Sequence, residues 1–373
     1  MGLTGKPVLV LAIALAVVLF TATVWCWPRL ARRGARAVLG RVGMLLATQV
    51  ALFATVGLLA NNSFLFYGSW ADLLGRKQEM GVVTDHAAGT LAAKNIVRVD
   101  TRRPDVPGGA VPTRGGRIDK VVISGRRTGI ETPAYVYLPP EYFQPAYAHR
   151  KFPAVVVLTG YPGTAENLIE GLRYPRTAFD RVKAGRAQPM ILVMLRPTVA
   201  PPRDTECVDI EGGPQTETFF ADDVPHAVSA GYRVGGHARN WGIIGNSTGG
   251  YCALKIGLHH PDRYAASAGL SAYYKAAEDP TTGDLFHGDE SARRRADLMW
   301  TLDNRPQPAG SFLVTTSRQG ESNYASTRKF IAKVKRPAQV SSIVLKSGGH
   351  NFNTWRREIP AALEWLSSRL SES

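Results

Sequence analysis

A serine in a glycine-rich turn is the first candidate for chemistry in this sequence. Ser247 lies in the segment WGIIGNSTGGYCALKIGL, residues 241–258, with Gly245 two positions before it and Gly249 two positions after it. An apolar strand followed by a helix is the context of a G-x-S-x-G nucleophile elbow, and its sharp turn needs the space that glycine leaves. We therefore expect Ser247 to be the nucleophile of an acyl-transfer reaction. A structural turn with a solvated serine is the alternative.

A serine hydroxyl is a weak nucleophile without a base. Glu321 is the single acidic residue between Ser311 and His350, and His350 is the single histidine after Glu321. The order Ser, Glu, His is the one that an α/β-hydrolase requires. We expect His350 to take the proton of Ser247 and Glu321 to orient the imidazole. The alternatives are a loop histidine and a surface carboxylate, with Asp303 as the next candidate for the acid.

The oxyanion of an acyl transfer needs two backbone N–H donors. Thr248, the residue after Ser247, is one candidate. The other is Tyr161, which follows Gly160 in the segment LTGYPG after an expected strand. A role for Tyr161 only as a wall of the pocket is the alternative.

The three cysteines of the chain allow two interpretations of its disulfide pairing. Cys26 lies in an apolar run near the N-terminus, whereas Cys207 and Cys252 lie in the C-terminal part. Those two are candidates for a disulfide, with two unpaired thiols as the alternative. No spacing of cysteine or histidine pairs predicts a metal, and no cofactor is expected. The acidic segment RDTECVDIEGG, residues 203–213, favours a solvated loop near the site over a metal cluster.

Short apolar segments alternate with helical patterns through most of the chain, which predicts a mostly parallel sheet covered on both faces. We expect an α/β-hydrolase fold over residues 116–373, with about eight strands and an antiparallel hairpin at its start. The expected strands cover residues 118–125, 132–140, 152–160, 189–197, 241–245, 264–271, 310–317 and 341–348; the expected helices cover 164–173, 219–232, 251–260, 325–335 and 359–370. Ligands of such sheets bind at the carboxyl ends of the strands, where the candidate residues lie.

Residues 1–60 contain no Asp or Glu and predict a membrane anchor. Two apolar runs, about 7–27 and 42–60, are long enough to cross a bilayer, which takes about 20 helical residues. The loop 28–41 between them holds five arginines and is expected in the cytoplasm by the positive-inside rule. This predicts a two-pass protein of the cell membrane, a juxtamembrane segment and linker at 61–115, and an extracytoplasmic hydrolase domain. A signal peptide followed by a core helix is the alternative.

The net charge of +15 falls to +9 for residues 61–373, once Lys6 and the five loop arginines are set aside. A modest basic excess outside a membrane suits anionic lipids or wall polymers. No nucleic-acid-binding motif is present in the sequence, so a nucleic acid partner is not expected.

Residues from about 118 to 370 resemble the esterase D and antigen 85 group of α/β-hydrolases. The segments that carry the resemblance are LTGYPG, QTETFFADDVPHAV, GIIGNSTGGYCALKIGLHHPDRY, GESNY and GGHNFNTWRREIPAALEWL. The resemblance implies Ser247 as nucleophile, Glu321 as acid, His350 as base, and Thr248 and Tyr161 as oxyanion donors. Antigen 85 enzymes are extracellular mycolyltransferases acting on trehalose and wall arabinan, and other members are carboxylesterases, including feruloyl esterases and S-formylglutathione hydrolase.

Two departures from that group bear on the substrate. The chain has two apolar helical segments in place of a cleaved signal, and its segment 196–215 matches no trehalose-binding segment. We expect a membrane-anchored serine esterase or acyltransferase that acts on acyl esters or glycolipids of the cell envelope. The sequence favours neither hydrolysis nor acyl transfer, and it predicts no oligomeric state. A non-catalytic hydrolase-fold scaffold or binding protein is the alternative.

Overall fold

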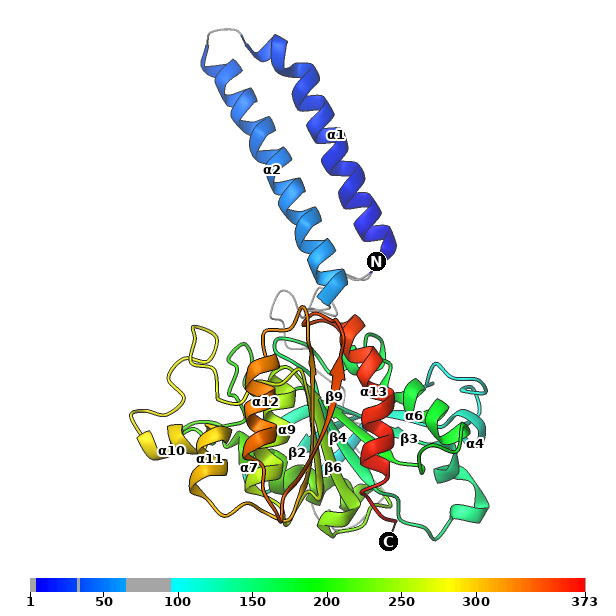
Figure 1. Cartoon of the computed structure of the whole chain (residues 1–373). Coiled ribbons are helices and arrows are strands. Elements are labelled where there is room, and N and C mark those ends of the chain that lie inside the picture. Colours follow the sequence, from blue (N-terminus) through cyan, green and yellow to red (C-terminus); the bar gives the residue numbers. More distant parts are fainter. Residues whose placement is uncertain (1–4, 32–33, 65–94, 373) are drawn as a thin grey trace. The chain divides into compact units, whose positions relative to one another are not determined.

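The computed structural model describes residues 5–31, 34–64 and 95–372 (Figure 1). The chain divides into two units, Met1–Gln78 and Glu79–Ser373. The first is helical, and the second is an α/β unit.

The α/β unit is built on one sheet in the order β1-β2-β3-β5-β4-β6-β7-β8-β9. The antiparallel pairs are β1 with β2, β2 with β3 and β3 with β5, and the remaining pairs are parallel. The strands are β1 (Ile96–Arg102), β2 (Arg117–Ser124), β3 (Glu131–Leu138), β4 (Ala154–Leu158), β5 (Ile191–Leu195), β6 (Trp241–Asn246), β7 (Ala266–Leu270), β8 (Ser311–Ser317) and β9 (Gln339–Leu345).

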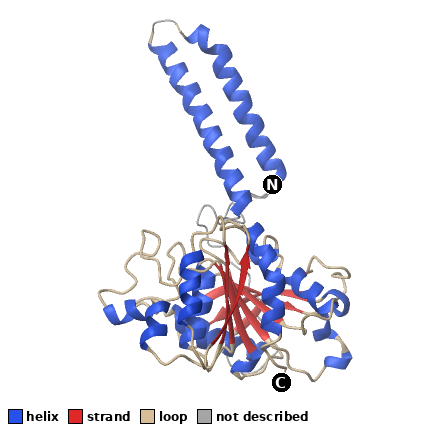
Figure 2. Cartoon of the chain, viewed as in Figure 1, coloured by secondary structure: helices blue, strands red, loops and turns tan. Residues whose placement is uncertain are grey.

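Helices cover both faces of this sheet, with α6 and α13 on one side and α9 and α12 on the other (Figure 1). Figure 2 shows the strands enclosed between these two helical layers. The helices of the unit are α4 (Pro112–Gly115), α5 (Glu166–Ile169), α6 (Tyr174–Lys183), α7 (Thr216–Thr218), α8 (Val224–Gly231), α9 (Thr248–His259), α10 (Glu290–Arg295), α11 (Leu298–Asn304), α12 (Tyr324–Lys333) and α13 (Phe352–Ser367), with the π-helical turn η3 (Phe219–Asp223) and the 3-10 turns η1 (Pro140–Phe143), η2 (Pro145–Tyr147) and η4 (Ala238–Asn240).

The helices on both faces of the sheet explain why the central strands are apolar. Strands β4 and β5 read AVVVL and ILVML, and every residue of both is buried. A parallel strand with helices on both faces has no solvent side, so it reads as an unbroken apolar run. The predicted α/β-hydrolase fold with a mostly parallel sheet is confirmed.

The sheet begins earlier than the sequence indicated. Residues 61–115 were expected to be a juxtamembrane segment and linker, but β1 lies within them and pairs with β2, which gives nine strands where about eight were expected. The β1 sequence IVRVDTR is charged and mostly exposed, and its register shifts between Arg98 and Asp100. An edge strand of this kind lacks the apolar run that marks a buried strand. Residues 65–94 of the expected linker lie outside the described residues.

The helix expected at 164–173 is also different. Only the single turn α5 forms there, and the longer helix α6 follows it with Pro175 in its first turn. Proline is tolerated at the start of a helix because its missing N–H would have no helical partner there. The pattern had therefore placed a helix one segment too early.

The N-terminal unit consists of α1 (Lys6–Leu30) and α2 (Ala35–Phe64). The apolar stretches of these helices, Pro7–Leu30 and Ala35–Asn61, have mean hydropathies of 2.7 and 2.0 over their most apolar windows. The Thr23 and Thr48 hydroxyls lie 2.9 Å apart and join the two helices. Large apolar side chains remain exposed, among them Leu39 and Phe53. Two such helices match a membrane anchor or a signal sequence. Arg32 and Arg33 of the predicted cytoplasmic loop lie outside the described residues.

Candidate active site

The turn between β6 and α9 holds Ser247 in an unusual backbone conformation. Its φ is 56° and its ψ is −123°, a combination that residues other than glycine rarely adopt. The Ser247 N–H donates to Leu270 O at 3.0 Å, which ties the turn to the end of β7. Such strain persists only where the surrounding structure holds it, and it clusters at functional sites.

Three glycines make room for this turn. A Cβ at Gly245 would lie 2.3 Å from the Gly249 carbonyl carbon, and a Cβ at Gly249 would lie 2.3 Å from Thr159 O. A Cβ at Gly160 would lie 2.9 Å from Ser247 Cβ. The close approach of β4, β6 and α9 therefore explains the glycine pattern.

His350 follows β9 and meets Ser247 across the end of the sheet. Its Nε2 lies 2.9 Å from Ser247 Oγ, which is the hydrogen-bond distance that a general base requires. The imidazole is half-exposed, and Trp355 of α13 packs against it edge to face at 5.1 Å. The structure thus brings together two residues that are 103 positions apart in the chain.

Glu321 follows β8 and lies on the other side of the imidazole. Its Oε2 is 4.0 Å from His350 Nδ1, and its side chain is only 1% exposed. That distance allows an ion pair but exceeds a hydrogen bond. Asp303, the alternative acid, instead pairs with Lys333 and is half-exposed.

Four residues that sequence reasoning did not select support Glu321. Ser271 Oγ donates to Glu321 Oε1 at 2.7 Å and accepts from Trp355 Nε1 at 2.8 Å. The Ser271 N–H donates to Thr315 Oγ1 at 3.0 Å, and that hydroxyl donates to Glu358 Oε2 at 2.8 Å. Glu358 is fully buried, and burial, with the nearby Glu321 carboxylate, raises its pKa to about 8. The one sequence signal was the position of Ser271 at the end of the strand expected at 264–271.

The two expected oxyanion donors lie beside the nucleophile. Thr248 follows Ser247 and opens α9, where free N–H groups point toward the helix N-terminus. Tyr161 follows Gly160, which lies against Ser247. The Tyr161 side chain is held by a hydrogen bond of 2.9 Å to Pro202 O. The use of these two backbone N–H groups by an oxyanion stays a prediction.

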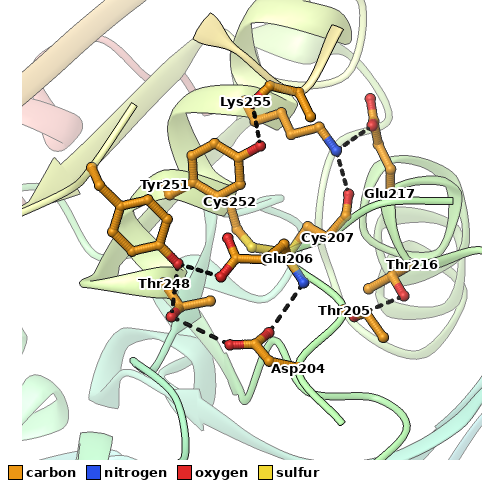
Figure 3. The surroundings of a disulfide bond; sticks show 12 residues. Asp204, Thr205, Glu206, Cys207, Thr216, Glu217, Thr248, Tyr251, Cys252 and Lys255 are labelled. Carbon is orange, nitrogen blue, oxygen red and sulfur yellow. Dashed lines mark hydrogen bonds and ion pairs between the residues drawn. A yellow bond between two sulfur atoms is a disulfide. The ribbon is translucent and has the colours of Figure 1, made fainter. Parts of the chain in front are cut away.

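A disulfide joins Cys207, in the loop after β5, to Cys252 of α9, over a sequence separation of 45 (Figure 3). Cys26 is a free thiol in α1. Within residues 203–213, Asp204 and Glu206 are buried rather than solvated, which differs from the expected surface loop. Among the described residues, no group of three or more His, Cys, Asp or Glu side chains is placed to hold a metal ion.

Burial changes the acid–base behaviour of this loop. It raises the pKa of Asp204 to about 6, with the charge of Asp279 adding to the effect. Burial and the neighbouring Asp204 charge raise the pKa of Glu206 to about 8. Two carboxyl groups that are close together and withdrawn from water titrate well apart.

The sequence of this chain is similar to a known protein family and to distant relatives. The family model described as "Putative esterase" matches residues 125–366. An uncharacterized protein of Corynebacterium glutamicum is 25% identical over 252 residues, which cover 63% of this chain and 57% of that protein. The MPT51/MPB51 antigen of Mycobacterium tuberculosis is 30% identical over 80 residues, 21% of this chain and 25% of the antigen. The chain thus matches little more than half of the first of these relatives and a quarter of the second.

Three solved structures share this fold at low sequence identity. A ferulic acid esterase aligns with a TM-score of 0.57 at 19% identity, covering 68% of this chain and 98% of that one. An S-formylglutathione hydrolase from Agrobacterium tumefaciens gives 0.53 at 18% identity, with coverages of 69% and 97%. The fluorophosphonate-binding serine hydrolase F of Staphylococcus aureus gives 0.54 at 16% identity, with 67% and 98%. These similarities establish the fold, and the resemblance noted from the sequence is confirmed.

Proposed function

The chain belongs to the putative esterase family of α/β-hydrolases, and from this premise we propose that it is a serine esterase or acyltransferase held at a membrane. One observation carries the proposal. Ser247 Oγ, on a strained turn at the carboxyl edge of the sheet, lies 2.9 Å from His350 Nε2.

The proposed reaction proceeds through an acyl-enzyme. His350 Nε2 takes the proton of Ser247 as its Oγ attacks the ester carbonyl carbon, and the carbonyl oxygen becomes an oxyanion. The N–H groups of Thr248 and Tyr161 stabilise that oxyanion. The C–O bond to the leaving alcohol then breaks, and His350 gives the alcohol its proton. Glu321 orients the imidazole and stabilises its charged form.

A second half-reaction frees the enzyme. Water, or the hydroxyl of an acceptor, attacks the acyl carbonyl while His350 takes its proton, and Ser247 Oγ leaves and is reprotonated. Water as acceptor makes the protein an esterase, and a sugar hydroxyl makes it an acyltransferase. We propose cell-envelope esters as donors and envelope glycans as acceptors of transfer, because the apolar helices α1 and α2 would hold the enzyme at a membrane.

A fluorophosphonate probe tests the nucleophile without knowledge of the substrate. The probe phosphonylates an activated serine, so wild-type protein should be labelled at Ser247, as peptide mass would show. Ser247→Ala should abolish labelling, and His350→Ala should slow it strongly because the base is lost. Ser271→Ala is not a suitable control, since Ser271 holds the acid; Ser326→Ala, on α12 with its hydroxyl bonded to Asn323 O, should be labelled like wild type. Labelling of Ser247→Ala at the wild-type rate would contradict the proposal that Ser247 is the nucleophile.

A further inference from the structure

Hydrogen-bonded carboxyl and hydroxyl groups surround the side chain of Thr248, the residue after the nucleophile (Figure 3). The Thr248 hydroxyl lies 3.0 Å from the Tyr273 hydroxyl and 3.5 Å from Asp204 Oδ2. Tyr273 donates to Glu206 Oε1 at 2.6 Å. These four residues, Asp204, Glu206, Thr248 and Tyr273, are called the Thr248 network below. The proposed mechanism uses only the backbone N–H of Thr248, so it assigns no role to the side chains of these four residues.

The loop that carries the two carboxyl groups is fixed to α9. The Cys207–Cys252 disulfide is one link. The second is Lys255 Nζ, which is buried and donates to Cys207 O at 2.6 Å. Figure 3 shows both links beside Glu206. Because the loop and the helix are joined twice, the network has one defined geometry relative to the first turn of α9.

That first turn is where the proposed oxyanion develops. The N-terminus of a helix carries a partial positive charge, which favours a nearby negative charge. Ionised carboxylates at the same end compete with the oxyanion for this field. Asp204 and Glu206 both reach Thr248, Asp204 directly and Glu206 through Tyr273.

The surroundings of Glu206 favour its uncharged form. It is 2% exposed, and its Oε2 has no hydrogen-bond partner among the described residues. A buried carboxylate without full hydrogen bonding is costly, whereas the protonated acid is not. Burial together with the Asp204 charge holds the pKa of Glu206 at about 8.

Four charged or titratable groups face Glu206. Asp204 from the same loop opposes its ionisation, while the hydrogen bonds from Tyr273 and from the Ala277 backbone, together with Lys255 of α9, favour it. Tyr251 of α9 is the fourth, and burial raises its pKa well above the usual value, so it remains neutral. Lys255 is itself paired with Glu217 at 2.7 Å, so burial and then the Asp204 charge outweigh its effect on Glu206.

Building on the proposed function, we propose that Tyr273 and Glu206 are positioning residues of the reaction: the Tyr273 hydroxyl fixes Thr248 in the first turn of α9, and an uncharged Glu206 keeps a second negative charge away from the oxyanion. Ionisation of Glu206 should then slow catalysis. A general-base histidine alone gives activity that rises with pH and stays high, so a fall at alkaline pH requires a further group.

The test is the pH dependence of kcat and KM on a short-chain p-nitrophenyl ester between pH 5 and 10, with Ser247→Ala as the blank for spontaneous hydrolysis. Wild-type kcat should fall above about pH 8. Glu206→Gln is isosteric and uncharged, so it should keep the neutral-pH kcat and lose the alkaline fall. Circular dichroism would establish that each variant is folded.

Tyr273→Phe provides a second, independent variant. It should lower kcat about five- to tenfold with little change in KM, the effect of one lost hydrogen bond in the transition state. It should also move the alkaline limb to higher pH, because the hydrogen bond from Tyr273 lowers the pKa of Glu206. A purely structural role would not move that limb.

Tyr251→Phe is the matched control. Tyr251 stacks on Tyr273 with ring centroids 5.1 Å apart, but its hydroxyl donates to Ala296 O at 2.7 Å and not to Thr248. It should keep the wild-type kcat and pH profile. Equal losses in Tyr251→Phe and Tyr273→Phe would overturn the role of Tyr273, and an alkaline limb that is missing in wild type or persists in Glu206→Gln would overturn that of Glu206.

The outcome also separates this inference from the proposed function. Wild-type activity at pH 7 that is lost in Ser247→Ala supports the serine hydrolase whatever the alkaline limb does. If Ser247→Ala is as active as wild type at pH 7, the proposed function itself fails.

Discussion

At Ser247 the backbone is held at a positive φ by glycines that let three elements approach closely. That arrangement has a cost in strain that the packing around it must offset. It also leaves Oγ within reach of His350 Nε2, while Glu321 stands off at 4.0 Å from Nδ1. The three residues therefore differ in how directly they touch the reacting atoms.

This difference predicts a ranking of variants. Ser247→Ala and His350→Ala should each lose activity by roughly 10⁴- to 10⁶-fold, because nucleophile and base act as one unit. Glu321→Gln should lose less, since Glu321 only orients and stabilises the imidazole. Initial rates on a p-nitrophenyl ester give the ranking. Full activity of folded Glu321→Gln would assign the acid elsewhere, whereas Asp303→Asn, at a surface ion pair, is the control expected to stay active.

Glu358 leads to a prediction about stability. Its pKa is raised from 4.5 to about 8 in the folded state, so the native protein binds this proton more tightly than the unfolded chain. Its contribution to the free energy of unfolding should fall as pH rises from about 4.5 to 8 and then level off. Glu358→Gln resembles the protonated acid and should become more stable relative to wild type across this range.

Urea unfolding at pH 5 and pH 8.5 measures that difference. Glu131→Gln, at an exposed residue of β3, removes a carboxylate without burial and should shift little between the two pH values. If the stability of Glu358→Gln relative to wild type did not rise between pH 5 and pH 8.5, the pKa of Glu358 would not be raised in the folded protein.

At the scale of elements, motif and order were enough to select Ser247 and His350. Ser247 directly follows the buried strand β6, and His350 is the single histidine after the expected acid. The support of Glu321 was hidden for a physical reason. Ser271, Thr315 and Glu358 meet only through contacts between residues 43 to 50 positions apart, and no local pattern marks them. Strand β1 was missed for a related reason. Its exposed, charged sequence has no apolar strand pattern, and it belongs to the sheet because it pairs with β2.

The link between the loop after β5 and α9 predicts an effect of reduction. A disulfide that closes a loop of this length stabilises a protein by about 3–4 kcal/mol in the chain-entropy model. The double variant Cys207→Ala, Cys252→Ala should therefore unfold at clearly lower urea concentration than wild type. Wild type treated with reductant should approach the variant, while the variant itself should not respond. Thiol titration of denatured, unreduced wild type should find the single free thiol of Cys26; three free thiols would show that the bond does not form.

At the scale of the whole molecule, the two units differ in how much apolar surface they expose. Helices α1 and α2 leave large apolar side chains exposed. Helices of this length and composition fit the hydrocarbon core of a bilayer better than water. The α/β unit buries its apolar strands and contains a disulfide. Disulfides persist in oxidising compartments and are rare in the cytosol. We therefore propose that the arginines between the two apolar segments and the disulfide lie on opposite sides of one membrane.

This contrast predicts the topology. Intact cells that express a variant with Ser326→Cys, in the α/β unit, should react with a membrane-impermeant maleimide, because the proposed topology places that unit outside the cytoplasmic membrane. A variant with Ala37→Cys, next to the arginines that the positive-inside rule retains in the cytoplasm, should react only after lysis. Cys26 should be replaced by alanine in both variants, so that each carries one free thiol. Labelling of Ala37→Cys in intact cells, with Ser326→Cys protected until lysis, would invert the topology. Cleavage of the N-terminal helices, visible as a smaller mature mass, would instead favour a signal sequence over an anchor.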